Sequence, residues 1–574
     1  MENALGNDVR PRLLLGTSDF AQARRGGHVY IDKTHLAVEL IRGASSAVLF
    51  PRPRRFGKTL NLSMLRYWFE APHHADKNDI PALFEGLSVA SAGADVAAHF
   101  QRHPVIYLTF KDAKFRQWEE CQAHVAGQLR HEVLRHAPAW QSADLSPDDR
   151  QALEQIGRGA GTLGNLQDSL RVLSRSLHAA SGQEVVLLVD EYDTPIHTAW
   201  SNAYYDEAIE FFRNLFSEGL KDNPHLYRGV LTGILRVAKE SIFSGLNNVT
   251  VHSLLSHNYS SCFGFSDAEV QQLVALVPEA DVEGIRDWYN GYRMGGRVVY
   301  NPWSVISYLN AVADGFRPYW VNTASDELLR DLLIRQGPRL HDELADLIGG
   351  GAIVRVISEN IQLRDLGRKR DEIWSFLLFS GYLKAEEFRN EASGVVAELS
   401  IPNREVGMAY AQVFRGWLDR SLANVGPDEL CRALLNGEEQ AFEAHLQRLI
   451  VESLSYFDVA GRTPEAVYQA FLVGLLVHLK DTHVVESNRE SGFGRYDICV
   501  RPRAGMSGLR AGAVLELKSI MVDRGETAEA ALDAAMLQIR ERQYATALHQ
   551  AGADPVWLWA AVFDGKRAWV RVAK

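Results

Sequence analysis

The chain has 574 residues, of which 46% are hydrophobic and 23% are charged, a composition typical of ordinary globular proteins. This length exceeds what a single hydrophobic core supports, so we expect several domains. The net charge of −11 argues against a protein that coats nucleic acid over its whole surface, although it leaves room for a local basic groove.

The first third of the chain alternates between strand and helix patterns, which is typical of a three-layer α/β domain with a parallel sheet. A helical pattern over Leu60–Glu70 directly follows the first strand pattern. Short apolar runs predict four strands, at Ala47–Phe50, Val105–Phe110, Val185–Val189 and Gly229–Thr232.

The segment between the first strand and its helix, Arg52-Pro-Arg-Arg-Phe-Gly-Lys-Thr59, ends like a phosphate-binding loop. In such a loop, backbone N–H groups and a helix N-terminus surround a phosphate, the lysine reaches the outer phosphates, and the hydroxyl takes a magnesium position. Gly57, Lys58 and Thr59 fit this pattern, but Arg52 stands where the first glycine is usual. The loop alone therefore indicates either a divergent nucleotide site or a basic turn.

The third predicted strand runs directly into Asp190 and Glu191. In phosphate-loop enzymes an aspartate at this strand tip holds magnesium, and a following glutamate can orient and deprotonate the attacking water. The fourth strand ends in Thr232, whose hydroxyl is placed to contact the γ-phosphate or that water. The alternative is a plain acidic strand end before a turn, since Asp193 and Pro195 are turn residues. Taken together, the loop, the acidic strand end and the strand order favour nucleotide binding.

The rest of the chain divides into further parts by pattern. A first domain over 10–250 is followed by a mainly helical, aromatic-rich region over 251–420, which we interpret as a lid or adaptor with a packed core. A charged helical connector is expected over 421–459. A last α/β block covers 460–574 and ends in strand patterns at Val556–Val562 and Ala568–Val572.

A second group of polar residues lies in this last block. Asp497 precedes alternating strand residues, and Glu516 and Lys518 lie two positions apart on a strand pattern, so they share one face. Carboxylates on neighbouring strands beside a lysine can hold one or two magnesium ions and activate water, as phosphodiester cleavage requires. The alternative is a salt-bridged pair on an exposed strand face. Flanking amphipathic helices carry Glu465 and Gln538.

The cysteines and the apolar runs indicate the compartment. The four cysteines are far apart and form no Cys-x-x-Cys pair, which predicts reduced, buried thiols rather than a zinc site. The N-terminal residues show no secretion signal, and no apolar run reaches the roughly 18 residues of a membrane span. We therefore expect a cytoplasmic protein with no membrane partner.

Several motifs resemble the bacterial AAA-ATPase-like family, in which Arg-Pro-Arg-Arg-Phe-Gly-Lys-Thr is the usual form of the loop. The resemblance covers about residues 10–245. It is carried by Tyr30–Thr34, Arg52–Thr59, Val189–Pro195 and Leu231–Ser244, and it continues through Trp288–Tyr292, Tyr300–Trp303 and Tyr319–Thr323.

This resemblance implies ATP and Mg²⁺ as cofactors. Lys58 and Thr59 would bind phosphate and magnesium, Asp190 would be the acid on the metal side, Glu191 the catalytic base and Thr232 the sensor. Weaker candidates for charge stabilisation are Arg236 and Lys239, and Arg52, Arg54 and Arg55 are candidates to add positive charge around the phosphates.

The order helix–Asp–Glu-x-Lys–helix over about residues 460–572 resembles the PD-(D/E)XK nuclease superfamily, whose domain has an α/β restriction-endonuclease-like fold. The resemblance implies Asp497 and Glu516 as metal ligands and Lys518 as the residue that orients the nucleophile. Glu465 would be an accessory acid and Gln538 a supporting residue. Arg495 and Tyr496 precede Asp497, so the literal Pro-Asp is absent.

Two functions remain open from the sequence. One is an ATP-binding, ATP-hydrolysing protein whose C-terminal nuclease-like domain cuts DNA or RNA with the help of a metal. The other is a nucleotide-dependent switch or scaffold whose nuclease-like domain binds nucleic acid or protein without cleavage. The oligomeric state is not indicated by any pattern.

Overall fold

The computed structural model divides the chain into two compact units, Met1–Thr323 with Val354–Val406, and Ala324–Ile353 with Gly407–Lys574. The four-part division expected from the sequence remains a prediction. The residues that the structure describes are 13–71, 79–236, 248–320, 350–361, 370–392, 394–410, 427–454, 465–476, 482–487, 490–491, 494–503, 511–522, 525–541, 548–549, 552–565 and 567–574, together with positions 340, 343, 344, 347, 363, 366 and 479.

A five-stranded parallel sheet with the order β2-β3-β4-β1-β5 forms the centre of the first unit. Its strands are β1 (Ala47–Pro51), β2 (Val105–Thr109), β3 (Val185–Asp190), β4 (Leu226–Gly233) and β5 (Val249–Val251). All four predicted strands are confirmed. The strand β5 was not predicted, because three residues are too few to show a pattern.

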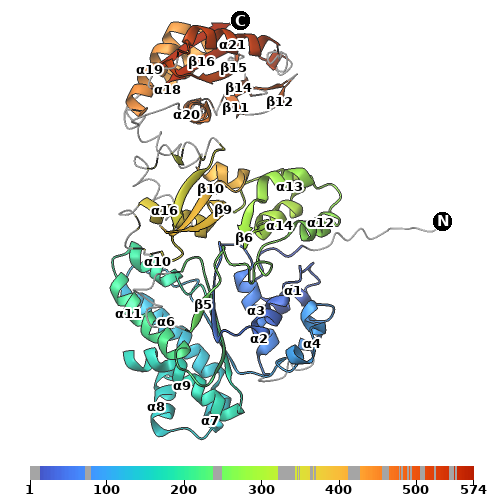
Figure 1. The fold of residues 1–574 in the computed structure, drawn as a ribbon, viewed down its shortest axis with the longest axis vertical. Coiled ribbons are helices and arrows are strands. Elements are labelled where there is room, and N and C mark those ends of the chain that lie inside the picture. Colours follow the sequence, from blue (N-terminus) through green and yellow to red (C-terminus); the bar gives the residue numbers. More distant parts are fainter. Residues whose placement is uncertain are drawn as a thin grey trace, which may run out of the picture. The chain divides into compact units, whose positions relative to one another are not determined.

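Helices cover both faces of this sheet, which confirms the expected three layers (Figure 1). Every residue of β3 is buried as a result, which explains its continuous apolar sequence. One face carries α1 (Phe20–Arg25), α2 (His35–Arg42) and α3 (Lys58–Phe69). Three short elements pack against these helices: α4 (Ile80–Leu83), η1 (Ser88–Ser91) and α5 (Ala94–Ala97). The other face carries α6 (Trp118–Arg135), α7 (Ala137–Ser142), α8 (Pro147–Gly157), α9 (Leu163–Ser181) and α11 (Tyr205–Leu220), and α10 (Thr194–Ser201) follows β3.

The strand order brings the functional candidates to one edge of the sheet. β4 lies between β1 and β3, with Phe50 opposite Thr232 and Val189 opposite Leu231. Because all three strands are parallel, their carboxyl ends meet at the same edge. The phosphate loop, Asp190 and Thr232 therefore converge there.

The rest of the first unit contains the expected helices, and it also contains strands that the sequence analysis missed. The helices are α12 (Asp267–Val274), α13 (Val282–Tyr289), α14 (Pro302–Asn310), η2 (Val312–Asp314) and α16 (Arg370–Ser380). The strands are the hairpin β6 (Tyr292–Met294) and β7 (Arg297–Val299) and the three-stranded sheet β8 (Ile353–Ile357), β10 (Gly394–Ser400) and β9 (Lys384–Glu391). β9 is largely exposed and charged, so it lacks the apolar alternation that signals a strand.

The second unit is built on a five-stranded mixed sheet with the order β11-β14-β15-β16-β17, which confirms the predicted C-terminal α/β block. Its strands are β11 (His483–Ser487), β14 (Ile498–Pro502), β15 (Gly512–Ser519), β16 (Val556–Asp564) and β17 (Arg567–Ala573), beside the short pair β12 (Glu490–Ser491) and β13 (Gly494–Arg495). Its helices are α18 (Pro427–Asn436), α19 (Glu439–Leu454), α20 (Glu465–Leu476) and α21 (Ala528–Glu541).

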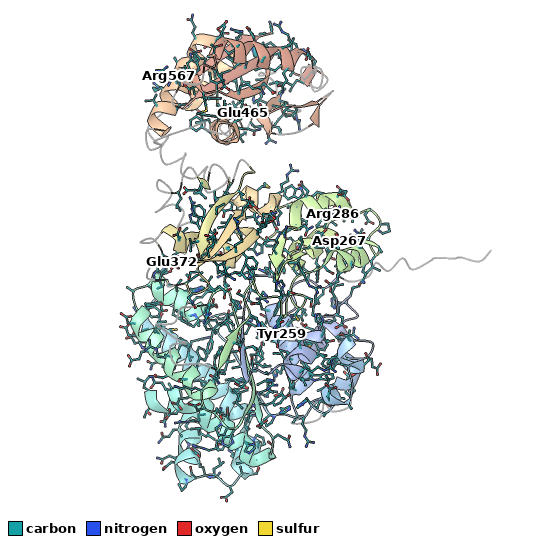
Figure 2. The ribbon with its side chains drawn as sticks, in the orientation of Figure 1. Tyr259, Asp267, Arg286, Glu372, Glu465 and Arg567 are labelled. Carbon is teal, nitrogen blue, oxygen red and sulfur yellow. The ribbon has the colours of Figure 1, made fainter. Side chains whose placement is uncertain are left out.

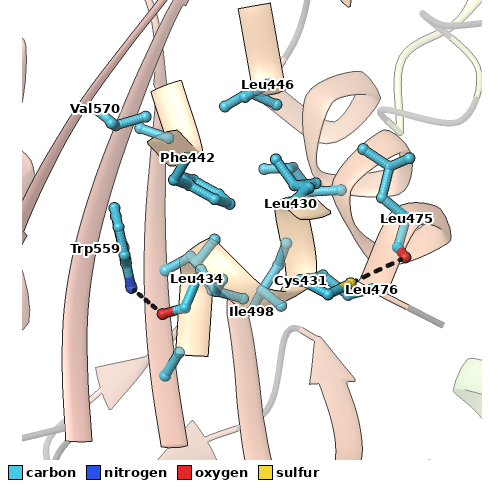
Figure 3. Close-up of a cluster of buried hydrophobic side chains, with 14 of the residues drawn as sticks. Leu430, Cys431, Leu434, Phe442, Leu446, Leu475, Leu476, Ile498, Trp559 and Val570 are labelled. Atoms are coloured by element: carbon cyan, nitrogen blue, oxygen red, sulfur yellow. Dashed lines mark hydrogen bonds between the residues drawn. The ribbon is translucent and has the colours of Figure 1, made fainter. Parts of the chain in front are cut away.

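Two apolar clusters lie in this unit, one on each face of the sheet. Leu515 and Leu517 of β15 belong to the cluster that includes α18, α19 and α20, whereas Val514 belongs to the cluster that includes α21. In the first cluster the Trp559 indole donates a hydrogen bond to the carbonyl of Leu434 at 3.2 Å (Figure 3). Alternate residues of β15 thus face different helices.

Among the residues that the structure describes, no helix combines the length and the apolar character needed to span a bilayer.

Candidate functional site

The phosphate loop joins β1 to α3 and is closed by Gly57, which has a φ of 82°. A glycine adopts this left-handed conformation without strain, and it lets the chain turn directly into the helix at Lys58. The first N–H groups of α3 have no partner within the helix and point toward the loop. This arrangement favours an anion, because the N-terminal end of a helix carries partial positive charge.

Lys58 is 6% exposed, and its ammonium group lies inside the curve of the loop. It donates hydrogen bonds to the carbonyl oxygens of Arg52 at 2.9 Å and Pro53 at 3.0 Å. An ammonium group has three donors, so one is left to contact an anion. Burial lowers the pKa of Lys58, while the nearby carboxylates, Glu191 foremost, oppose that shift.

Asp190 is fully buried at the end of β3 and accepts hydrogen bonds from two hydroxyl groups. Thr59 donates to Asp190 Oδ2 at 2.7 Å, and Thr232 donates to Oδ1 at 2.6 Å. Burial raises the pKa of Asp190, and these two hydrogen bonds counteract the rise. A carboxylate and a hydroxyl side by side are hard oxygen ligands of the kind that magnesium prefers, so these residues fit the metal that the sequence implies.

Glu191 follows with a φ of 51°, a conformation that is uncommon for a residue other than glycine. Thr194 donates a hydrogen bond to its Oε2 at 3.1 Å. Asp193, predicted only as a turn residue, accepts hydrogen bonds from the N–H groups of Ile234 at 2.8 Å and Leu235 at 2.9 Å. Asp193 thereby joins the end of β3 to the end of β4.

The loop arginines occupy different surroundings. The Arg52 guanidinium points into the interior, where Nη1 donates to the carbonyls of Pro51 at 2.9 Å and His252 at 2.6 Å. Arg55 instead lies on the surface with its Cζ 3.8 Å from the centre of the Trp303 ring. Arg52 is therefore not oriented like a phosphate ligand, whereas Arg55 is held on the exposed side of the loop by Trp303.

Arg236 is half-buried just after β4, near the end of the strand that carries Thr232. Lys239 lies outside the residues that the structure describes.

Aromatic residues of the middle region support the phosphate loop from outside, a role that the sequence analysis did not foresee. Trp320 donates its indole N–H to the carbonyl of Arg54 at 3.1 Å, and Phe56 packs edge-on against Tyr292 at 5.0 Å. The helix that carries Trp303 begins at a Pro directly after Asn301, whose side chain accepts the N–H of Trp303 at 2.9 Å.

A buried carboxylate, Glu405, links two parts of this support. It accepts hydrogen bonds from the backbone N–H of Trp320 at 2.6 Å and from the hydroxyl of Ser304 at 2.8 Å. Burial raises the pKa of Glu405 to about 7, although both hydrogen bonds act to lower it. The position of Trp320 on the loop therefore depends on a group whose charge changes near neutral pH.

In the second unit the structure brings the predicted β15 residues together. Lys518 Nζ lies 3.2 Å from Glu516 Oε1, which confirms that the two side chains share a face of the strand. Gln538 of α21 donates its amide to the same oxygen of Glu516. Glu516 is 1% exposed, whereas the side chain of Lys518 is 27% exposed, so a buried carboxylate lies beside an ammonium group that is partly open to solvent.

Asp497 and Glu465 approach the same strand from other elements. Asp497 Oδ2 accepts the backbone N–H of Leu517 at 2.7 Å, which places this carboxylate between Glu516 and Lys518 along β15. Glu465, which is labelled in Figure 2, lies at the start of α20 and accepts the N–H of Ser519 at 3.2 Å. Gln469, which the sequence analysis missed, donates to the carbonyl of Asp497 at 2.6 Å. Carboxylates converging on one strand beside a lysine fit an oxygen-ligated metal.

Comparisons with known proteins give a family model for each of the two regions that contain these sites. Residues 14–243 match the family model described as a predicted AAA-ATPase, and residues 463–572 match the model of the PD-(D/E)XK nuclease superfamily. The chain therefore contains an AAA-ATPase-like region and a PD-(D/E)XK nuclease-like region, as its motifs predicted.

Two individual proteins are similar to this chain. An uncharacterized protein in vnfD 5'region of Azotobacter chroococcum mcd 1 is 33% identical over 327 residues, which is 56% of each chain, so the match spans little more than half of that relative. The Walker-type ATPase PABY2304 of Pyrococcus abyssi is 14% identical, with a TM-score of 0.36, over 70% of this chain and 99% of its own.

Proposed function

We propose that this protein binds and hydrolyses ATP with Mg²⁺ at the phosphate loop and that its C-terminal site cleaves nucleic acid phosphodiesters with a bound metal. The observation that carries the first part is the pair of hydroxyls, from Thr59 and Thr232, that meet on Asp190. The observation that carries the second is the convergence of Asp497, Glu516 and Lys518 on β15.

At the phosphate loop each residue would have a separate task. Magnesium, held by Thr59 and Asp190, would neutralise phosphate charge during transfer. Lys58 would direct its remaining N–H to the outer phosphates, in line with the N-terminus of α3. Glu191 would accept a proton from the attacking water, with Thr194 orienting its carboxylate, and Thr232 would contact the γ-phosphate side of the site.

At the C-terminal site the carboxylates of Asp497 and Glu516 would hold the metal, which supplies an activated water and stabilises charge on the phosphate. Lys518 would turn from Glu516 to the nucleophile or the phosphate once the metal neutralises that carboxylate. Gln538 and Gln469 would keep Glu516 and Asp497 in place through the hydrogen bonds described above.

The ATPase proposal is tested by measuring Mg²⁺-dependent binding of ATP to the full chain and to its Lys58→Ala variant. We expect Lys58→Ala to weaken binding by roughly 10- to 100-fold, because a hydrogen bond to a charged group contributes about 1.5–3 kcal/mol. Lys111→Ala, which removes an exposed lysine outside the loop, is the matched control. Equal affinity in all three proteins would refute the site.

The nuclease proposal is tested by incubating single- and double-stranded DNA and RNA with the full chain and Mg²⁺ or Mn²⁺. We expect cleavage by the wild type and by Lys114→Ala, and none by Lys518→Ala. If the wild type binds nucleic acid or a protein partner but leaves every substrate intact, the nucleotide-dependent switch or scaffold replaces the nuclease as the function of this unit.

A further inference from the structure

A histidine, a glutamate and a cysteine come together next to the phosphate loop, in a place that neither proposed site uses. His35 and Glu39 lie one turn apart on α2 and so share a face of that helix. Cys262 reaches them from the segment after β5, far away in the sequence. One ligand atom from each of the three residues lies within 4.8 Å of the other two.

Hydrogen bonds hold these side chains in place. The Cys262 thiol donates to Glu39 Oε1 at 3.7 Å, and the backbone N–H of Tyr259 donates to Glu39 Oε2 at 3.1 Å. His35 Nε2 lies 3.1 Å from the hydroxyl of Ser261. Cys262 is buried, whereas His35 and Glu39 are half-buried and give the cluster an opening to solvent.

A second observation points to an anion at this position. The Arg52 guanidinium is fully buried near Cys262, and its Nε and Nη2 have no hydrogen-bond partner among the described residues. Burying such donors without an acceptor costs stability. A thiolate at Cys262 would supply negative charge beside this guanidinium, whereas the neutral thiol does not.

We propose that His35, Glu39 and Cys262 bind one zinc ion, with water as the fourth ligand. Imidazole, carboxylate and thiolate are the ligands that zinc takes in proteins, and a soft thiolate disfavours magnesium. On binding, the hydrated zinc ion keeps one of its waters and releases the others to solvent, as the three side chains complete a four-coordinate shell. The Cys262 S–H bond breaks, its proton goes to solvent, and the sulfur electron pair forms the S–Zn bond.

The cluster is close to the required geometry. With Zn–S of about 2.3 Å and Zn–N or Zn–O of about 2.0 Å, the three tetrahedral ligand atoms lie about 3.3–3.5 Å from one another. The sulfur and the carboxylate oxygen, at 3.7 Å, are already close to this spacing. The other separations are at most 4.8 Å, so closing the site needs shifts of about 1 Å, within the reach of side-chain rotation.

Zinc at this position would link α2 to the segment around Cys262, and this segment contacts residues on both sides of the phosphate loop. Asn61 of α3 donates its amide to the carbonyl of Cys262 at 2.9 Å, and the Arg52 guanidinium lies 4.9 Å from the ring of Phe263. Both contacts connect the proposed ligand segment to residues at the two ends of the loop. The zinc ion would therefore be structural and separate from the magnesium of the ATPase proposal.

The test is a titration of the metal-free full chain with Co²⁺, which occupies zinc sites and reports a sulfur ligand through thiolate-to-cobalt charge-transfer absorption. We expect one Co²⁺ per chain with this absorption, displaced by Zn²⁺. Cys262→Ser should lose the absorption. His35→Ala should weaken Co²⁺ binding by at least about tenfold, because even the loss of a residue that only orients a metal ligand lowers metal affinity by about that factor. Cys431→Ser, which alters a buried cysteine of the second unit, should bind like the wild type.

X-ray absorption of the cobalt-loaded wild type tests the proposal without any variant, and it should show one sulfur in the first coordination shell. A first shell of oxygen and nitrogen alone would overturn the proposal. Charge-transfer absorption that persists in a folded Cys262→Ser chain would also overturn the proposal. Because these readouts do not involve ATP, they stand or fall independently of the proposed ATPase.

Discussion

The phosphate-loop site and the C-terminal carboxylate site use the same kinds of side chain, but they hold their lysines differently. Lys58 bonds to carbonyls of its own loop, so Asp190 is left to the hydroxyls of two threonines. Lys518 pairs directly with the acid Glu516. The first lysine is placed by the shape of the backbone, whereas the second is placed by the charge of a carboxylate that would itself hold the metal.

The two sites also differ in the residues that support them. The phosphate loop is supported by residues that take no part in the proposed chemistry, namely Trp303, Trp320 and Glu405. The C-terminal site is supported by hydrogen bonds to its own acids, from Gln538 and from the backbone N–H of Leu517. Substitutions away from the first site should therefore affect it more than substitutions away from the second.

The largest effect is expected at the proposed base of the first site. Glu191→Gln should lower the rate of ATP hydrolysis by roughly 10²- to 10⁴-fold, because a positioned general base contributes about that factor. ATP affinity should stay close to wild type, since Lys58 and Thr59 are untouched. Steady-state hydrolysis and calorimetric binding measure the two quantities, and the exposed Glu210→Gln on α11 is the control. Unchanged hydrolysis would assign the base elsewhere.

A pH dependence is expected from the support of the first site. Because burial raises the pKa of Glu405 from 4.5 to about 7, the folded chain binds this proton more tightly than the unfolded chain. The contribution to the free energy of unfolding is thus fully present below pH 4.5 and is lost as pH rises to about 7, by roughly 3 kcal/mol.

Thermal unfolding of the wild type and of Glu405→Gln between pH 5 and pH 8 measures this effect. The variant should lose the part of the pH dependence that the wild type owes to Glu405, and the exposed Glu387→Gln on β9 should keep it. Identical pH profiles for the wild type and Glu405→Gln would mean that Glu405 does not titrate in this range.

A smaller effect is expected on metal binding at the C-terminal site. Lys518→Ala should abolish cleavage but raise the affinity for Mg²⁺ about fivefold. The affinity rises because the metal no longer competes with an ammonium group for Glu516, and a partly exposed ion pair contributes about 1 kcal/mol. Magnesium binding can be followed by calorimetry without nucleic acid. A weaker affinity for Mg²⁺ in the variant would show that Lys518 helps to place the metal ligands. Lys518 would then not differ from Lys58 in the way described above, as a lysine that competes with the metal for its acid.

The smallest effect is expected for the Arg55–Trp303 contact. Trp303→Leu should weaken Mg²⁺–ATP binding about two- to fivefold, since a cation–π contact at an exposed site contributes about 0.5–1 kcal/mol. Trp303→Phe should retain most of the affinity because it keeps an aromatic face. Combining Trp303→Leu with Arg55→Gln should add nothing to Arg55→Gln alone. If the losses in affinity from the two substitutions add fully, Trp303 does not act by positioning Arg55.

Much of both sites was predictable because their signals are local. The loop between β1 and α3 is contiguous in sequence, and parallel strands carry Asp190 and Thr232 to one edge wherever they stand in the sheet. The shared face of Glu516 and Lys518 likewise follows from the two-residue period of a strand.

The contacts that were missed depend on tertiary packing. The aromatic patterns of the middle region indicated a core, but nothing in their spacing placed Trp303 and Trp320 on the phosphate loop. The burial of Arg52 was equally unpredictable, because an arginine in a polar loop is usually solvated. Cys262 was read as an isolated thiol, since its neighbours on α2 lie far away along the chain.

The replacement of a loop glycine by Arg52 has a consequence for the entropy of binding. Pro53 fixes its own φ, and Arg52 is tied through its side chain to two interior carbonyls, so this part of the loop has few conformations left. Gly381 adds to this restriction, since a Cβ there would lie 2.8 Å from Pro53 Cβ. A flexible glycine loop loses backbone freedom when it closes around an anion. Here that freedom is lost during folding, so a phosphate meets a loop that already has its shape.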